Sequence, residues 1–420
     1  MGLREESRKA DSTVLTHASP SSFAGRANAQ SIANSMWGLA EVGARTPKLV
    51  AAVNLKAKAF YIEANFQEVS MTVRSMGVMG VKAPLLAAEI DEHAEAFVAG
   101  CFEKGIMQNI SNTVDGLSKM GAKAPKLVAA IEARADDFFA KAETQHISKT
   151  LWTLDGMGLE TPNLVEAINE MAESFSDRCI KEGNTQAVSN TLLAVAGLGS
   201  GPAVPNLFRS LLIADAVNML IKDGNEQAIC NTLYAVAIAG GLKEHARAVE
   251  ALWKEAIRRS EELLVAENLR QLHQVELCAG VEGGDELRLA AVSGSLRTRM
   301  DAAAQDVNIG ASSSHNEISG LLKNELGFDH ENEVSPFPDS RNPGFMAIDM
   351  ARKEDKVAIE FDGPSHFVTK LDGSFRHNGR TLAKTRLLKA LGWTVIRIPW
   401  FEWAEAEQNG RKVEFLRATI

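Results

Sequence analysis

The sequence predicts an α-solenoid of helix-pair repeats followed by a small α/β domain. A pattern that begins with glutamine and carries a glycine thirteen positions later recurs six times in the first two thirds of the chain. Segments typical of β-strands first occur after Gly310. The chain of 420 residues is also longer than one compact domain, so two or three domains are expected.

The repeats are spaced by 37 or 41 residues, a period typical of stacked helix pairs. The glycine suits the left-handed backbone just past a helix end, and a proline four positions later suits the start of a second helix. We therefore expect a solenoid over residues 28–310, with a weaker seventh unit from about Asn268. The glutamines are Gln30, Gln67, Gln108, Gln145, Gln186 and Gln227, the glycines are Gly43, Gly80, Gly121, Gly158, Gly199 and Gly240, and the prolines are Pro47, Pro84, Pro125 and Pro162.

The first helix of each repeat carries two stripes of side chains. Counted from the glutamine, positions 2, 6 and 9 are apolar and are expected in the core. Positions 0, 4 and 7 fall on nearly the opposite face. This second stripe is either a ladder of amides between neighbouring helices or a surface that reads single-stranded RNA by hydrogen bonding and stacking. The unvarying glutamine favours the ladder, whereas the varied position 7 favours a partner. The candidates for RNA contact at position 7 are Trp37, Arg74, Asp115, Trp152 and Tyr234.

The charge of the chain counts against a nonspecific nucleic-acid binder. The net charge is -9, and almost all of the excess lies before Ser313. Any RNA contact must therefore depend on local geometry and stacking. The same acidity supports an alternative function, that of a protein-interaction scaffold.

Other features exclude further classes of protein. The four cysteines are far apart, so buried thiols are expected and a zinc site is not. We find no apolar run of the length that a membrane helix needs. The first 27 residues mix acidic and basic side chains with a Ser- and Ala-rich stretch, and we expect them to be a disordered N-terminal segment.

The C-terminal part has the pattern of a small domain with a mixed sheet. A helix is expected at Glu317–Leu326, and strands in FMAIDMA, KVAIEFDG and TVIRIPW. A helix, TLAKTRLLKALG, lies between the last two strands, and RKVEFLRATI closes the chain as another helix.

Two resemblances to known families follow from these segments. The repeats QSIANSMWGLAEVG, QNISNTVDGLSKMG, QAVSNTLLAVAGLG and QAICNTLYAVAIAG resemble heptatricopeptide and octotricopeptide repeats over about residues 28–270. Residues 314–420 resemble a RAP domain, through IEFDGPSHF, Gly379–Arg380–Thr381 with Lys384 and Arg386, LGW and IPWFEW. The resemblances imply an organellar RNA-binding solenoid and a C-terminal domain of restriction-endonuclease-like fold.

The restriction-endonuclease resemblance implies an acidic site. Such nucleases hold metal ions between an aspartate on one strand and a Glu-x-Lys on the next. Asp349 matches the first position, and Glu360 and Asp362 match the second pair. Asp362 stands where the lysine is expected, and His366, or Lys384 and Arg386, are candidates for the missing basic role. We therefore expect binding without catalysis and without a cofactor. The alternative is a Mg²⁺-dependent ribonuclease with the three carboxylates as metal ligands.

The sequence and the resemblances together imply an RNA-binding protein of an organelle. Its expected partners are single-stranded or structured organellar RNA and ribonucleoprotein components, with no membrane contact. The expected role is RNA processing, transcript stability or ribosomal RNA maturation in the mitochondrial matrix, with the plastid as the alternative. In the C-terminal domain, the basic residues expected to contact phosphates are Arg376, Arg380, Lys384 and Arg386.

Overall fold

The computed structural model describes residues 27–260, 265–292, 294–305, 312–337 and 346–420. The chain divides into two compact units between Ile168 and Asn169. The predicted disordered segment over residues 1–27 lies outside the described residues, apart from its last residue. No described helix is long and apolar enough to cross a membrane.

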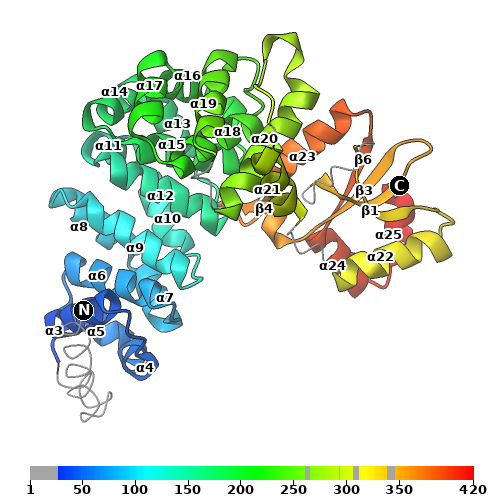
Figure 1. Cartoon of the computed structure of the whole chain (residues 1–420). Coiled ribbons are helices and arrows are strands. Elements are labelled where there is room, and N and C mark those ends of the chain that lie inside the picture. The colour runs from blue at the N-terminus through cyan, green and yellow to red at the C-terminus, as the bar shows by residue number, and fades with distance from the viewer. Residues whose placement is uncertain (1–26, 261–264, 293, 306–311, 338–345) are drawn as a thin grey trace, which may run out of the picture. The chain divides into compact units, whose positions relative to one another are not determined.

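The repeats are helical throughout, but the second helix is interrupted in the first five repeats and continuous in the sixth (Figure 1). In the first unit the helices are α3 (Ala29–Glu41), α4 (Pro47–Leu55), α5 (Ala57–Glu63), α6 (Phe66–Val78), α7 (Pro84–Glu92), α8 (Ala94–Glu103), α9 (Met107–Lys119), α10 (Pro125–Glu132), α11 (Ala135–Lys141), α12 (Thr144–Met157) and α13 (Pro162–Glu170), the last of which crosses the boundary. The expected single second helix is wrong, because the backbone leaves helical geometry at residues such as Lys56 (φ -106°) and His93 (φ -102°). No glycine or proline marks either break, so the pattern contains no signal for it.

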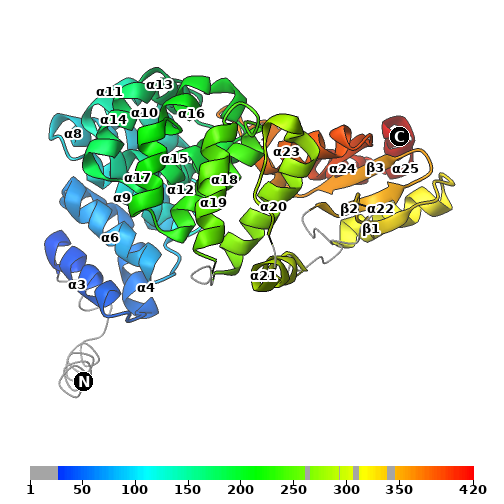
Figure 2. The same cartoon turned by 45° about the horizontal axis from the view of Figure 1, so that its top comes forward.

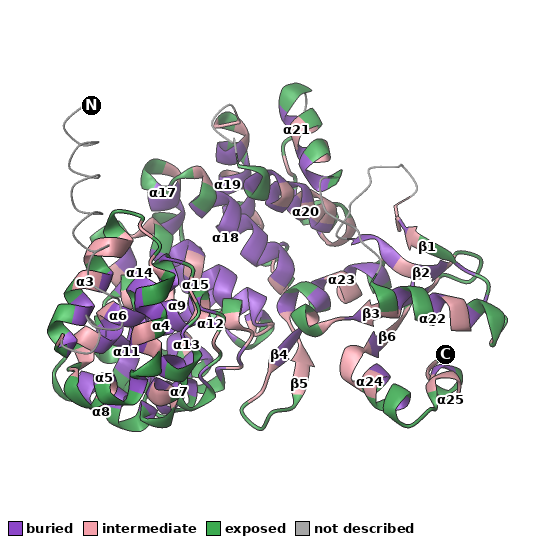
Figure 3. Ribbon diagram, turned by 90° about the horizontal axis from the view of Figure 1, so that it is seen from below, coloured by how far each residue is buried: buried purple, intermediate pink, exposed green. Residues whose placement is uncertain are grey.

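The second unit continues the repeats. Its helices are α14 (Ala172–Glu182), α15 (Thr185–Gly197), α16 (Pro205–Leu211), α17 (Ala214–Asp223), α18 (Glu226–Ala239), α19 (Ala246–Arg258), α20 (Ala266–Glu282) and α21 (Gly294–Gln305). The weaker seventh repeat is therefore present as α20. Figure 3 shows α18 as almost entirely buried, as expected for a helix with neighbours on most sides.

The glycine and proline signals of the repeats are confirmed. All six repeat glycines have left-handed backbones, with φ from 62° at Gly158 to 78° at Gly199 and Gly240. The four prolines are each the first residue of a second helix. These residues set the helix ends because glycine adopts a left-handed backbone without steric cost and proline needs no N–H partner at a helix start.

Polar side chains at the end of one second helix cap the second helix of the next repeat. The Asn54 side-chain oxygen accepts hydrogen bonds from the backbone N–H groups of Leu85 and Leu86, at 2.9 and 3.1 Å. Asp91 accepts one from Leu127 at 2.9 Å. The N–H groups of a first helical turn have no partner within their own helix, so these caps tie each repeat to the next. The capping residues are Asn54, Asp91, Glu132 and Asn169.

The C-terminal domain contains a four-stranded mixed sheet with the strand order β1-β2-β3-β6. The pairing of β3 with β6 is parallel, and the other two pairings are antiparallel. The elements are α22 (Ser313–Asn324), β1 (Glu331–Val334), β2 (Ile348–Arg352), β3 (Val357–Asp362), β4 (Phe367–Thr369), β5 (Phe375–His377), α23 (Gly379–Ala390), β6 (Thr394–Pro399), α24 (Trp400–Gln408) and α25 (Lys412–Thr419). The predicted helices and strands are present, whereas β1, the β4–β5 hairpin and α24 were not predicted.

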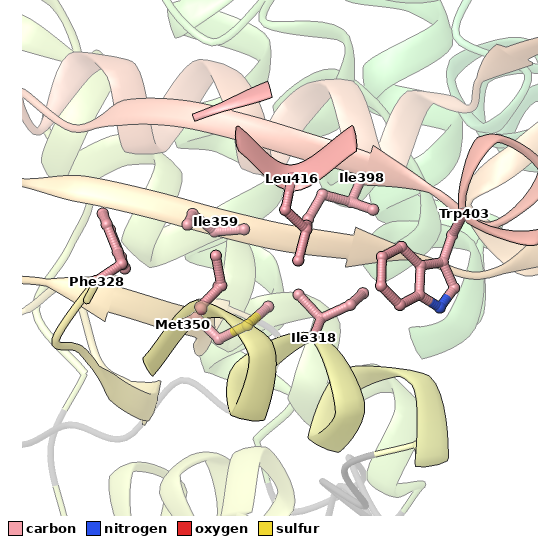
Figure 4. Packing of buried hydrophobic residues seen from close by; sticks show 8 residues of the cluster. Ile318, Phe328, Met350, Ile359, Ile398, Trp403 and Leu416 are labelled. Carbon is pink, nitrogen blue, oxygen red and sulfur yellow. The ribbon is translucent and has the colours of Figure 1, made fainter. Parts of the chain in front are cut away.

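The two faces of this sheet differ in chemistry. One face packs against α22, α24 and α25 through an apolar core (Figure 4). The other face carries carboxylates and is covered by α23, whose Lys384 reaches Glu360. The split follows from strand geometry, since alternate side chains of a strand point to opposite faces. The labelled core residues are Ile318, Phe328, Met350, Ile359, Ile398, Trp403 and Leu416.

Candidate nucleic-acid interface

Positions 0, 4 and 7 of the first helices form one surface in the first unit, as the sequence predicted. A pocket of about 190 Å³ lies across α3, α6 and α9 on this surface. Its lining includes Trp37, Gln67, Arg74, Gln108 and Asn112. The Trp37 side chain is 49% exposed, so its ring is available to a partner. With Asn109 and Glu41, the pocket thus combines an aromatic ring, a guanidinium group, four amides and one carboxylate.

A basic cluster surrounds Asp115 on the same surface. The Asp115 carboxylate lies 3.0 Å from the ammonium of Lys119 and 3.1 Å from that of Lys149. Arg74 is close enough to lower the pKa of Lys149, although burial is the larger cause of that shift. Asp115 is only 8% exposed, which argues against a direct RNA contact by its side chain. Its neighbours make this part of the surface locally positive.

The side-chain hydrogen bonds that link neighbouring first helices involve residues at position 4 and not the glutamines at position 0. Lys149 donates to the side-chain oxygen of Asn112 at 3.1 Å. Gln271 donates to that of Asn231 at 2.9 Å. All six repeat glutamines are exposed, so the assignment of the ladder to them is wrong.

Position 7 of the stripe is exposed in the first unit, except at Asp115, and buried in the second. Trp152 is 38% exposed on α12. At the equivalent positions of the second unit, Leu193 is 2% and Tyr234 is 8% exposed. Burial raises the pKa of Tyr234 to about 12, and Arg380 of α23 lies beside its hydroxyl and acts in the opposite direction. Tyr234 is therefore part of the packing between α18 and α23, which corrects its assignment to RNA stacking.

Three of the four basic candidates in the C-terminal domain face the repeats of the second unit. Arg376 donates to the backbone oxygen of Leu198 at the end of α15. Arg386 donates to the oxygens of Ala237 and Ile238 at the end of α18, at 2.8 and 3.1 Å. Helix C-termini carry unpaired carbonyl groups and partial negative charge, which these cations neutralise. Figures 1 and 2 show α23 beside α18 and α20. The expectation that Arg376, Arg380 and Arg386 contact phosphates is therefore replaced by a domain interface.

The fourth basic candidate, Lys384, lies over the acidic face of the sheet. Its ammonium is 2.5 Å from the Glu360 carboxylate and 2.7 Å from the backbone oxygen of Ala347. Glu360 is 1% exposed, and its pKa is raised to about 6 mainly by burial. Asp349 accepts a hydrogen bond from the N–H of Phe361 at 2.8 Å. Lys384 thus supplies the ammonium group that position 362 lacks. It is one of the residues that the sequence suggested for this role.

Asp362 is not available as a metal ligand. Its carboxylate lies 2.9 Å from ring nitrogens of both His366 and His377, and 2.5 Å from the guanidinium of Arg397. Burial acts to raise its pKa, but these three partners hold it well below its usual range. Three partners occupy most of the acceptor positions of this buried carboxylate, which argues against the predicted trio of Asp349, Glu360 and Asp362 as one metal site. No sequence signal pointed to Arg397, and His377 was a candidate only as part of the basic cluster around Arg376.

Comparison with known proteins places the C-terminal segment in a known domain family. A family model described as the RAP domain matches residues 359–419. A RAP domain-containing protein, chloroplastic, from Oryza sativa subsp. japonica is 33% identical over 73 residues. This match covers 17% of the present chain and 11% of that relative. The family match lies within the sheet domain, and the chain spans only about a tenth of the length of the rice protein.

Proposed function

We propose that this chain, a helical-repeat protein whose C-terminal domain is a RAP domain, binds single-stranded RNA through the repeats of its first unit. The observation that carries the proposal is the pocket lined by Trp37, Gln67, Arg74, Gln108 and Asn112. Aromatic rings stack on unpaired bases, amides hydrogen-bond to base edges, and guanidinium groups contact phosphates. RAP domains are a family linked to RNA binding, which supports the same function for the whole chain.

The local charge of this surface supports the proposal despite the acidic chain. Asp115 is the centre of a cluster with Lys119 and Lys149, and Arg74 lies close by. Three cations against one carboxylate favour the approach of a phosphate backbone. Selectivity would come from the amides and from the varied side chains at position 7, so different repeats would read different bases.

The proposed setting is an organelle, where the protein would act in RNA processing, transcript stability or ribosomal RNA maturation. The similar rice protein is named as chloroplastic, which supports the plastid alternative over the mitochondrial matrix. Localisation of the fluorescently tagged full-length gene product tests this directly. Signal confined to the cytosol would contradict the organellar setting without affecting RNA binding.

The first test is the affinity of the full chain for a pool of short single-stranded RNAs, measured by filter retention and fluorescence anisotropy. Trp37→Ala should weaken binding by roughly 5- to 150-fold, since stacking on one base contributes about 1–3 kcal/mol. Arg74→Gln should reduce the salt dependence of binding by about 0.7 in the log–log slope, as expected for one lost phosphate contact.

Two matched variants serve as controls for these changes. Leu55→Ala removes an apolar side chain that is 77% exposed on α4, away from the pocket lining. Lys126→Gln removes an exposed cation that pairs with Glu92. Both should bind RNA as the unmodified chain does. Failure of the unmodified chain to retain any RNA would contradict the proposal and favour a protein-interaction scaffold.

One observation favours a second candidate, a metal-dependent ribonuclease activity of the RAP domain. Lys384, Glu360 and Asp349 bring an ammonium and two carboxylates to the same face of the sheet. Incubation of bound RNA with Mg²⁺ or Mn²⁺, and then with EDTA, tests it. Cleavage that is lost in EDTA and in Glu360→Gln would establish the activity, and intact RNA in both metals would exclude it.

A further inference from the structure

A row of carboxylates crosses three adjacent strands of the RAP domain. The pairs Asn332–Met350 and Val334–Ile348 flank the position where Glu333 of β1 lies opposite Asp349 of β2. The β2–β3 pairing joins Met350 to Ile359, so one step further along, Asp349 lies opposite Glu360. Like charges directly opposite each other across strands are destabilising. Such a row therefore requires a compensating positive charge.

Lys384 compensates only part of this charge. It is paired with Glu360, and it also lies near enough to Glu333 to lower the pKa of that carboxyl. Burial and Asp349 have the opposite effect on Glu333, and burial is the largest cause, so its pKa is raised. The other nearby cation that acts on Glu360, Arg397, is paired with Asp362, so the three carboxylates keep an excess of negative charge that a divalent cation would offset.

A buried histidine completes the set of possible ligands. His315, near the start of α22, is 4% exposed, and its Nδ1 lies 3.7 Å from the Glu333 carboxylate. Its Nε2 has no hydrogen-bond partner among the described residues. The same is true of Oε1 of Glu360, whose other oxygen binds Lys384. Buried polar atoms are rarely left without partners, so the unpartnered Oε1 of Glu360 indicates an absent ligand beside these carboxylates, whereas in His315 it is Nδ1 and not Nε2 that faces Glu333.

We propose that His315, Glu333 and Asp349 bind one divalent transition-metal cation, with Glu360 as the adjoining carboxylate. One ligand atom from each of the three residues lies within 4.8 Å of the others. Metal–ligand bonds of about 2.0–2.2 Å place opposite ligand atoms about 4.2 Å apart, so a small contraction closes the site. The half-buried Glu333 side chain provides that movement.

The ligand types select the kind of cation. Mg²⁺ prefers an octahedron of oxygen atoms, whereas an imidazole nitrogen with carboxylates suits Mn²⁺ and its heavier neighbours. This ligand set differs from the one that the restriction-endonuclease resemblance implied. Asp362 is excluded by its three partners, while His315 and Glu333 join from α22 and β1.

Direct titration of the full chain with Mn²⁺, without RNA, tests the site. Binding is followed by the electron paramagnetic resonance of free Mn²⁺ and by isothermal calorimetry. The expected result is one site per chain that binds Mn²⁺ more tightly than Mg²⁺. Glu333→Gln and His315→Gln should each weaken it by about tenfold or more. Glu331→Gln, two residues away and paired with Lys353, is the matched control and should leave binding unchanged.

Thermal unfolding provides a second readout that does not depend on the stability of His315→Gln. Glu333→Gln removes the charge opposite Asp349, so it should raise the unfolding temperature of the metal-free protein and abolish the further rise that Mn²⁺ gives the unmodified chain. Absence of stoichiometric binding, or equal binding by Glu333→Gln, would overturn the proposal. Because no RNA is present, either result leaves the RNA-binding proposal unaffected.

Discussion

Glu132 is a buried carboxyl group in the first unit that serves the following repeat. Its two oxygens accept hydrogen bonds from the N–H groups of Asn163 and Leu164, at 2.9 and 3.1 Å. The residue is 2% exposed, and burial raises its pKa to about 7, against the opposing effect of the two N–H groups. A raised pKa means that the folded state binds the proton more tightly than the unfolded state. Protonated Glu132 therefore stabilises the folded state fully below about pH 4.5, and this stabilisation is lost as the pH rises through about 7.

We predict that Glu132→Gln removes this pH dependence. Glutamine keeps one oxygen acceptor for the helix cap but does not ionise, so the variant should gain stability relative to the unmodified chain between pH 5 and pH 8. The gain should be on the order of 1–3 kcal/mol. Urea unfolding at several pH values measures it, with exposed Glu95→Gln as the control. A difference that stays constant with pH would contradict the prediction.

At the scale of elements, α23 carries two interfaces at once. Its Lys384 faces the sheet, and its first turn meets the end of α15. A Cβ atom at Gly379 would lie 1.7 Å from the backbone oxygen of Ala196, so only glycine allows this approach. The Gly379–Arg380–Thr381 turn, which the sequence singled out as part of the RAP resemblance, thus has a packing reason for its glycine.

Gly379→Ala should separate α23 from α15. Overpacking of a close backbone contact costs about 1–3 kcal/mol, and the added methyl group has no other space. Faster hydrogen exchange in the last turn of α15 and the first turn of α23 is the expected signature. Gly320→Ala, in α22, meets no atom within 4 Å and should be neutral or slightly stabilising. Equal exchange in both variants would show that the contact is not tight in solution.

At the scale of the whole molecule, the RAP domain and the later repeats form one compact unit. Arg386 joins three elements of it, since its guanidinium binds the end of α18 and lies 2.6 Å from the Glu282 carboxylate of α20. The carbonyls at the end of α18 would otherwise lack partners in their own helix. This arrangement explains why the compact unit extends across the predicted domain boundary at residues 310–314.

Arg386→Gln should uncouple the RAP domain from the repeats of this unit. The loss of charge-assisted hydrogen bonds should cost about 2–3 kcal/mol at the interface and leave the Glu282 carboxylate without its guanidinium partner. In scanning calorimetry, a transition shared by the two parts should split into two. Lys389→Gln, an exposed position on the same helix, is the control. An unchanged thermogram for Arg386→Gln would mean that the interface does not couple the two parts.

The candidate site could be predicted in part from the sequence. Trp37 and Arg74 share a pocket because helical periodicity places positions 0, 4 and 7 on one face. Arg376 and Arg386 were misassigned because a basic side chain has the same sequence signature whether it meets a phosphate or a helix C-terminus. The sequence did not indicate the proposed metal ligands His315 and Glu333, because residues that approach from separate elements leave no spacing pattern.

The sequence by itself determined the repeat architecture, the helix ends and the small mixed-sheet domain. These features depend on local backbone preferences and on the periodicity of apolar residues, both of which are properties of neighbours along the chain. Only the tertiary structure decided which polar side chains remain available to a partner. Tyr234, Asp115 and Asp362 were all candidates for contact with a partner or metal from the sequence, and burial beside residues from other elements gives each of them a different role. Such contacts join residues far apart in the chain, and no local pattern records them.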